Sequence, residues 1–304
     1  MGPAHRNRPG GPGGSASHPR GRVPRPGGGV VNRRVVGLAR REAGWVRRAL
    51  VRDPQNLFFT VGLPLLYLFI FAGIFGSETT PFPGQPGTLT VSTIMTASVV
   101  VIGVVSAAFQ YPAINLITER ENGVLKRLRS TPVPTGVFVA GYVINAVVVS
   151  VLMAAGVTAL GVVAYGVPWP GRRIVPLVAT VLLGSVACAA AAFPFTRVVR
   201  KSSAAAAASV SVTLVLFFLS GNFFPGAELP PAMAAVASVF PVRHFFLAAL
   251  TAFNPNTVGS GAEWGHLGVL ALWAVGGTLA GLRWFRWNPS GQDYSCGCGA
   301  AGCC

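Results

Sequence analysis

The cysteines are the side chains of this sequence best suited to hold a metal. Four of the five lie in the C-terminal stretch CGCGAAGCC, as Cys296, Cys298, Cys303 and Cys304, and thiolates are ligands for soft metals. Structural zinc sites usually keep about two to four residues between paired cysteines on a shaped turn, whereas here one, four and zero residues intervene in a glycine-rich end. We therefore expect a flexible tail over residues 288–304 and no metal site. Metal binding is the first alternative, followed by lipidation or a redox role.

Few other side chains suit catalysis. His244 and His266 lie near the ends of apolar segments, where a polar tip at an interface is ordinary, so we expect neither catalysis nor ligand binding from them. Cys188 lies among alanines and is expected to pack as a small residue. The long apolar runs contain no carboxylate or base, although proton-coupled transporters and intramembrane hydrolases need such groups at depth. The polar exceptions are expected to bond helix to helix: Gln110, Asn115 and Asn145.

Phosphate chemistry is also missing from the sequence. No G-x-x-x-x-G-K-[ST] loop occurs in it, so this chain is not expected to bind ATP in the usual way. We predict that it is not an enzyme and holds no cofactor of its own.

A short island of charged residues occupies positions 118–134, TERENGVLKRLRSTPVP. Thr118 and Glu121 match the S/T-x-x-E capping box, which predicts that a helix begins at Thr118. Glu119 and Glu121 suit the positive end of that helix, and basic residues suit its negative end. The basic residues there are Lys126, Arg127 and Arg129. We predict a helix over residues 118–130.

This predicted helix has a small apolar face. Val124, Leu125 and Leu128 recur at i, i+3, i+4 spacing, which places them on one side, and Pro132 and Pro134 end the helix. Two interpretations stay open: the helix inserts into a groove of a partner, or it lies on the lipid surface as a polar connector.

The island is flanked by segments that read as membrane spans. Mean hydropathy is +0.57 and only 11% of residues are charged, which is typical of a polytopic membrane protein. Residues 88–118 and 130–171 contain no Asp, Glu, Lys or Arg, and about 20 apolar residues cross the hydrocarbon core. We predict an all-α fold with six spans, at about residues 57–76, 89–117, 136–166, 174–196, 204–221 and 264–282.

The N-terminal region is basic. Residues 1–30 are rich in Gly, Pro and Arg without an apolar pattern, so we expect a disordered arm. Over residues 31–52 arginine pairs recur every seven residues, nearly two helical turns, so they form one stripe of an amphipathic helix that lies on an anionic membrane surface. The pairs are Arg33 and Arg34, Arg40 and Arg41, and Arg47 and Arg48. Asp53 and Pro54 then break the helix.

The distribution of charge predicts the orientation. The net charge of +16 could suggest a nucleic-acid partner, but the basic residues collect between the spans, so we expect none. With the N-terminus inside, 21 of the 24 basic residues fall on the cytoplasmic side, and only Arg172, Arg173 and Arg243 lie outside. By the positive-inside rule both termini are cytoplasmic. The Ala, Gly, Val, Pro and Arg bias, with Lys126 and Lys201 as the only lysines, indicates a GC-rich bacterial genome.

Residues 222–254, NFFPGAELPPAMAAVASVFPVRHFFLAALTAFN, are too apolar for an ordinary loop. Prolines divide them into pieces too short to cross a bilayer. We predict a pair of short helices that enter the outer leaflet and return, which is tolerated when they are buried against protein. The alternative is a proline-broken seventh span, which would place Arg283 and Arg286 outside, against the charge rule.

Two of these motifs resemble the ABC-2 type permeases of ABC transporters. The island matches the coupling region of that family at Glu119, Arg120, Glu121, Gly123, Leu125, Leu128, Arg129, Thr131, Pro132 and Val133. Residues 222–254 match its F-F-P-x-x-x-L-P…P exit motif at Phe223, Phe224, Pro225, Leu229, Pro230 and Pro241. The resemblance covers about residues 31–287 and includes bacterial drug and antibiotic exporters.

The resemblance implies a permease in a bacterial plasma membrane. Its coupling helix, with Val124 among its contacts, would bind a separate ATPase that carries ATP and Mg, and two ATPase copies would serve this chain and a second permease copy or paralogue. A lining of Phe, Val, Leu and Ala favours a lipophilic or amphiphilic compound, such as a drug or secondary metabolite. Polysaccharide or lipid-linked glycan export is the main rival. Two different classes of protein also stay open, an ATP-independent transporter or channel and a membrane-embedded lipid-modifying enzyme.

Overall fold

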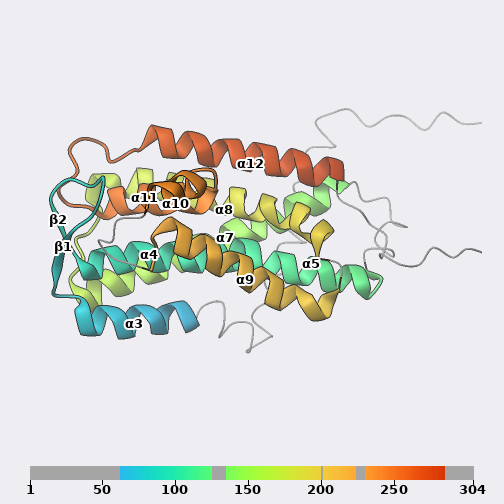
Figure 1. The fold of residues 1–304 in the computed structure, drawn as a ribbon, viewed down its shortest axis with the longest axis horizontal. Helices are drawn as coiled ribbons and strands as arrows, with labels where there is room; N and C mark the ends of the chain where they lie inside the picture. The colour runs from blue at the N-terminus through green and yellow to red at the C-terminus, as the bar shows by residue number, and fades with distance from the viewer. Residues whose placement is uncertain (1–61, 125–134, 200, 224–229, 285–304) are drawn as a thin grey trace, which may run out of the picture.

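The computed structural model describes residues 62–124, 135–199, 201–223 and 230–284. In this part the chain is mostly helical, as the sequence predicts, and most helices run along one long axis (Figure 1). The elements, in chain order, are α3 (Leu63–Phe75), β1 (Thr79–Pro81), β2 (Thr88–Thr90), α4 (Val91–Val105), η2 (Ser106–Gln110), α5 (Tyr111–Glu121), α7 (Thr135–Tyr165), η3 (Gly171–Arg173), α8 (Ile174–Val198), α9 (Ser202–Ser220), α10 (Pro231–Ala237), α11 (Pro241–Phe253) and α12 (Trp264–Trp284).

Helix α4 forms the centre of the bundle. All of its residues except Ile102 are buried, because α3, α7 and α11 pack around it. Helices α4, η2 and α5 form one continuous apolar segment, Val91–Glu121. The η2 turn is π-helical, with the Tyr111 N–H bonded to Ser106 O. It ends two residues before Pro112, which has no N–H to donate and would crowd the carbonyl four residues earlier in a regular helix.

Four described helices are long and apolar enough to cross a membrane, and five if α10 and α11 together make one span. The four are Val91–Glu121, Phe138–Tyr165, Gly171–Val198 and Ser202–Ser220. Helix α9 is the most exposed of them, with only 22% of its apolar window buried. Its buried residues form a narrow i, i+4 stripe, Ala205, Ser209, Thr213 and Phe217. The rest of α9 therefore presents an apolar surface to lipid or to another protein.

Small residues let α8 and α12 approach closely. A Cβ placed on Gly277 would lie 2.8 Å from the Ala190 Cβ, and one on Gly281 would lie 3.2 Å from the Phe193 Cβ. The spacing of these two glycines is the small-xxx-small pattern that brings membrane helices together. Close packing here fixes α12 against the bundle.

Helices α10 and α11 differ from the others. They are bent by 97° relative to one another, and the turn between them directly precedes Pro241 at the start of α11. Helix α11 is almost fully buried and packs against α8, α4 and α12. At about 1.5 Å per residue, neither its 13 residues nor the 7 of α10 spans the roughly 30 Å hydrocarbon core.

A small cap closes the end of the bundle opposite α5. The β1–β2 hairpin pairs Thr79 with Thr90 and lies at the far left of Figure 1. Asn254, fully buried, donates from Nδ2 to Gln85 Oε1 at 3.1 Å and so ties the end of α11 to the hairpin turn. Arg173 donates to the carbonyls of Asn254 and Thr257 at 2.6 and 2.7 Å. These bonds fix the loop between α11 and α12.

Candidate functional site

The charged island follows directly on the end of α5. The predicted start of a helix at Thr118, with a capping box between Thr118 and Glu121, is wrong. Thr118 lies inside α5, which runs on to Glu121, and its hydroxyl donates to Ile114 O at 2.9 Å. The apolar span upstream supplies the helical turn that the cap was expected to start. The helix ends at Glu121, and Gly123, just past that end, has a φ of +71°, as is typical of the glycine that follows a helix C-terminus.

Arg120 lies beneath the end of α8 rather than on an open surface. Its side chain is 7% exposed, and it donates to Thr196 O at 2.7 Å and Val199 O at 3.1 Å. The last carbonyls of a helix have no partners within the helix and carry the negative end of its dipole. The planar guanidinium offers several donors in a fixed arrangement, so Arg120 acts as the C-terminal cap of α8.

Glu121 performs the opposite task for α9. Its Oε2 accepts a hydrogen bond from the Ser202 N–H at 2.6 Å, and Ser202 is the first residue of α9. The first N–H groups of a helix lack partners, and the helix dipole favours a negative charge there. Because Val91–Glu121 has 31 residues, at about 1.5 Å each it is longer than the hydrocarbon core, and exposed Glu121 lies beyond it. Hydrogen bonds from the Ser202 side chain and backbone lower the pKa of Glu121.

Glu119 completes the contacts of this turn. Its Oε2 accepts a hydrogen bond from the Tyr142 hydroxyl at 2.7 Å, and Tyr142 belongs to α7. The last turn of α5 is thus bonded to three helices, α7, α8 and α9. We call Glu119, Arg120 and Glu121 the α5 clasp. Sequence analysis identified these residues but assigned them to the surface that meets an ATPase.

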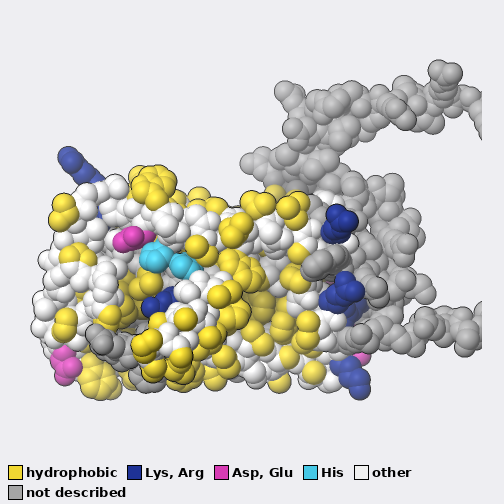
Figure 2. Space-filling view, turned by 45° about the horizontal axis from the view of Figure 1, so that its top comes forward, with side chains coloured by type: hydrophobic (Ala, Val, Ile, Leu, Met, Phe, Trp, Pro, Cys, Tyr) yellow, Lys and Arg dark blue, Asp and Glu magenta, His cyan; other side chains and the backbone are white. Residues whose placement is uncertain are grey.

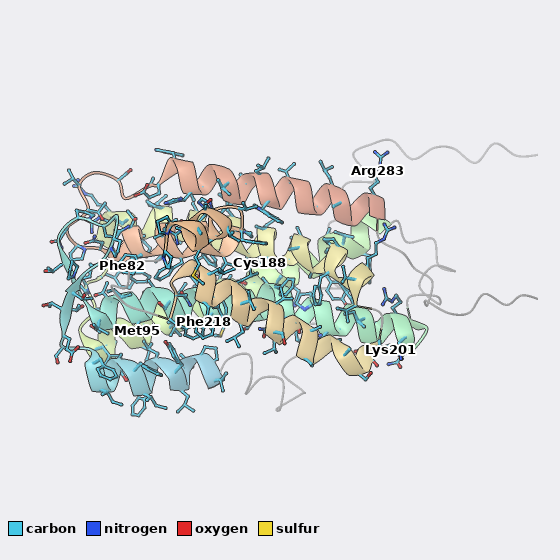
Figure 3. All side chains as sticks on the ribbon, viewed as in Figure 1. Phe82, Met95, Cys188, Lys201, Phe218 and Arg283 are labelled. Carbon is cyan, nitrogen blue, oxygen red and sulfur yellow. The ribbon has the colours of Figure 1, made fainter. Side chains whose placement is uncertain are left out.

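The remaining island residues are only partly placed. Val124 is 39% exposed, and Leu125, Leu128 and Arg129 lie outside the described residues. Lys201 and Arg283 lie near this end of the bundle (Figure 3). The expected membrane-surface arginines at positions 33–48, the disordered arm and the cysteine tail also fall outside the described part.

The predicted exit residues lie toward the opposite end. Phe223 packs edge-on against Tyr67 and Phe217, with ring centroids 5.9 Å apart in both pairs. Pro230 precedes α10 and Pro241 begins α11. Phe224, Pro225 and Leu229 lie outside the described residues.

A polar cavity of about 400 Å³ lies at this end. It is formed by the hairpin turn, the end of α9, α11 and the start of α12, and the polar side chains that line it include Gln85, Arg243, Glu263 and His266. His244 and His266 were expected to be separate interfacial side chains, but their Nδ1 atoms lie 2.8 Å apart. Figure 2 shows histidine, acidic and basic side chains together on one face. The sequence does not reveal this cluster, because Gln85 is far from the other members in the chain and Arg243 and His244 are 19 or more positions from Glu263 and His266.

A comparison with protein families settles which transporter class the chain represents. The model described as ABC-2 family transporter protein matches residues 78–283, more than half of the chain. The chain belongs to this family. The match includes both the α5 clasp and the polar cavity. A comparison with curated proteins found no match.

Membership in this family defines the general role of this ABC-2 transporter protein. The family supplies the membrane component of a transporter, not an enzyme, and normally works in a membrane with an ATPase subunit. The chain is therefore a multi-pass membrane protein, as the apolar helices also indicate.

Proposed function

We propose that this chain is the permease subunit of an exporter driven by a separate ATPase that binds at the charged island. The observation that carries the proposal is the α5 clasp. It bonds α5 to α7, α8 and α9, and its three residues lie in the first part of the island, at the end of α5. A push on the island would therefore reach these helices through short, charge-assisted hydrogen bonds, without an intervening flexible loop.

Six spans remain our proposal for the topology. Helix α12 has 21 residues, enough to cross a bilayer at about 1.5 Å per residue, and α3 is an apolar helix whose expected upstream part lies outside the described residues. The right-angle bend between α10 and α11 supports a re-entrant pair rather than a seventh span. A short re-entrant helix is tolerated at membrane depth when it is buried against protein, as α11 is.

The orientation follows from charge. Lys and Arg side chains gather at the end of the described bundle that carries the α5 clasp (Figure 2). Lys201 and Arg283 lie there (Figure 3), as does Arg197 in the last turn of α8. By the positive-inside rule we place this end and both termini in the cytoplasm of a bacterial cell. The hairpin and the polar cavity are then on the outside.

The substrate is proposed to be lipophilic or amphiphilic, such as a drug or secondary metabolite. Large apolar side chains remain exposed on α3 and α9, among them Phe69 at 65% and Val215 at 57%. These faces suit lipid, an apolar substrate or a second permease copy or paralogue. Two permeases and two ATPases, each ATPase holding ATP and Mg, form the proposed unit. A glycan or lipid-linked glycan exporter is the alternative.

The island contact can be tested with matched charge insertions. Val124→Asp places an unpaired charge in the proposed ATPase groove, at a cost of several kcal/mol when buried. Val198→Asp is the control, because Val198 is 79% exposed at the same end of the bundle but outside the island.

The two variants are compared by co-purification with a candidate partner ATPase that co-purifies with the wild-type chain, and by export. We expect Val124→Asp to insert normally and to lose both, while Val198→Asp keeps them. Full ATPase association of Val124→Asp would show that the island is a lipid-surface connector.

A further inference from the structure

The polar cavity at the outer end contains two opposite charges that do not neutralise one another. Arg243, on the first turn of α11, and Glu263, just before α12, both line it. Among the described residues neither makes an ion pair, and Arg243 makes no hydrogen bond. A half-buried guanidinium normally finds a carboxylate or another acceptor. The cavity thus holds a separated positive and negative charge with space between its walls.

The histidine pair adds a directional acceptor. The Nε2 of His244 lies 2.7 Å from Ser238 O, and a carbonyl can only accept, so this nitrogen carries the proton. In neutral His244 the Nδ1 is then an acceptor, and it accepts a hydrogen bond from His266 Nδ1–H at 2.8 Å. This network assigns the tautomer of His266: Nδ1 carries the proton, and Nε2 has a free lone pair that can accept a hydrogen bond. His266 lines the cavity beside Glu263.

The Glu263 carboxylate has one weak side-chain contact among the described residues. The hydroxyl of Thr251 lies 3.3 Å from Glu263 Oε1, but its single proton has a closer acceptor in Leu247 O at 3.0 Å, and Gln85 Nε2 donates to the same hydroxyl at 2.8 Å. A carboxylate can accept about four hydrogen bonds, so capacity remains for a ligand. The carboxylate and the Nε2 lone pair together suit an ammonium group, which only donates.

We infer that this cavity binds a zwitterion, with its anionic phosphate or carboxylate group on Arg243 and its ammonium group on Glu263 and His266. The arginine fork matches the oxygens of either anion. The volume of about 400 Å³ falls within the range of small-molecule sites. Pro83 and Gly84, both exposed, lie on the lining, so a molecule can enter from the surface. The site goes beyond the proposed export and stands whether or not the chain transports.

The test measures equilibrium binding to the purified full chain by calorimetry. The probe is glycerophosphoethanolamine, which carries both charges; glycerol 3-phosphate and ethanolamine each carry one kind. We expect the zwitterion to bind at least tenfold more tightly than either. Arg243→Gln should weaken binding of the zwitterion and of glycerol 3-phosphate by about tenfold or more. Glu263→Gln should weaken the zwitterion but not glycerol 3-phosphate, and so remove the advantage of the zwitterion.

Arg172→Gln is the matched control, since Arg172 is an exposed arginine near the same end, and it should bind as wild type. Arg243→Lys keeps the charge and should retain part of the affinity, which separates anion binding from a folding defect. Equal binding of the three probes, or wild-type affinity in both neutralised variants, would overturn the inference.

The source of the zwitterion is identified in a second arm. Nanodiscs of phosphatidylethanolamine that displace glycerophosphoethanolamine would assign the site to a lipid headgroup. Failure of these nanodiscs to compete, with soluble binding intact, would assign it to a free zwitterion.

Discussion

The α5 clasp makes a sharp prediction at Arg120. Replacing Arg120 with Met keeps much of the length of the side chain but removes the donors to Thr196 O and Val199 O. Hydrogen bonds to a charged group contribute about 1.5–3 kcal/mol each. The lower end applies best here, because the Val199 bond is only part-buried and water reaches this end of the bundle. The expected loss from these two bonds is therefore about 3 kcal/mol.

This loss should be visible as a lower melting temperature of the purified protein in detergent. At about 2–4 °C per kcal/mol for a chain of more than 150 residues, Arg120→Met should melt roughly 6–12 °C below wild type. Arg120→Lys keeps the charge but cannot span two carbonyls as the guanidinium fork does, so it should lose about half as much. Arg197→Met is the matched control, since Arg197 is an exposed arginine in the last turn of α8.

A local measurement separates the clasp from general destabilisation. Amide hydrogen exchange should rise first around residues 196–202, where α8 ends and α9 begins, because capping bonds hold this junction. If Arg120→Met melts within about 2 °C of Arg197→Met and exchange at this junction is unchanged, Arg120 does not hold α8, and the route from island to bundle proposed above fails.

Three further variants test other contacts. Gly277→Ala should lower the free energy of unfolding by about 1–3 kcal/mol through overpacking against Ala190. Gly276→Ala, with nothing within 4 Å of the new Cβ, should be neutral or stabilising. Equal melting temperatures of the two variants would contradict close packing of α8 against α12. Arg173→Ala should cost about 2 kcal/mol through its lost carbonyl bonds and Arg172→Ala under about 0.5 kcal/mol, compared by thermal unfolding. Hydrogen bonding to Ser202 lowers the pKa of Glu121 from its ordinary value of 4.5, so charged Glu121 stabilises the fold above that value, and this effect is lost as pH falls through the folded pKa. The melting temperatures of wild type and Glu121→Gln should therefore differ at pH 7 and converge in acid. A difference that stays constant with pH would refute this.

The apolar runs determined most of what the sequence could predict. Charge-free segments and glycine or proline boundaries predicted α7, α8, α9 and α12 within about three residues, because burial in lipid or protein depends on local composition. The prediction that a helix starts at Thr118 was wrong because a capping-box motif does not by itself show that a helix starts there. Such a motif acts where a helix must begin, but the preceding span already continued as a helix to Glu121.

The contacts between helices could not be read from composition. Arg120 meets Thr196 and Val199 across 76 and 79 residues, and nothing in the local pattern of the island distinguishes a buried arginine from one that faces a partner. The polar cavity was missed likewise, since His244 and His266 look ordinary in their own segments. The packing of α12 against α11 brings them together.

The two ends of the bundle use charge in different ways. At the α5 end the charges are matched to helix termini, with an arginine on carbonyls and a glutamate on an N–H, so they hold helices together. At the opposite end Arg243 and Glu263 line one cavity without forming an ion pair, so both can still bind a ligand. The first arrangement makes the protein rigid. The second makes binding selective, because an unpaired charge favours a ligand whose opposite charge pairs with it. The α5 end is therefore where we propose that an ATPase acts, and the cavity end is where we propose that a ligand is selected.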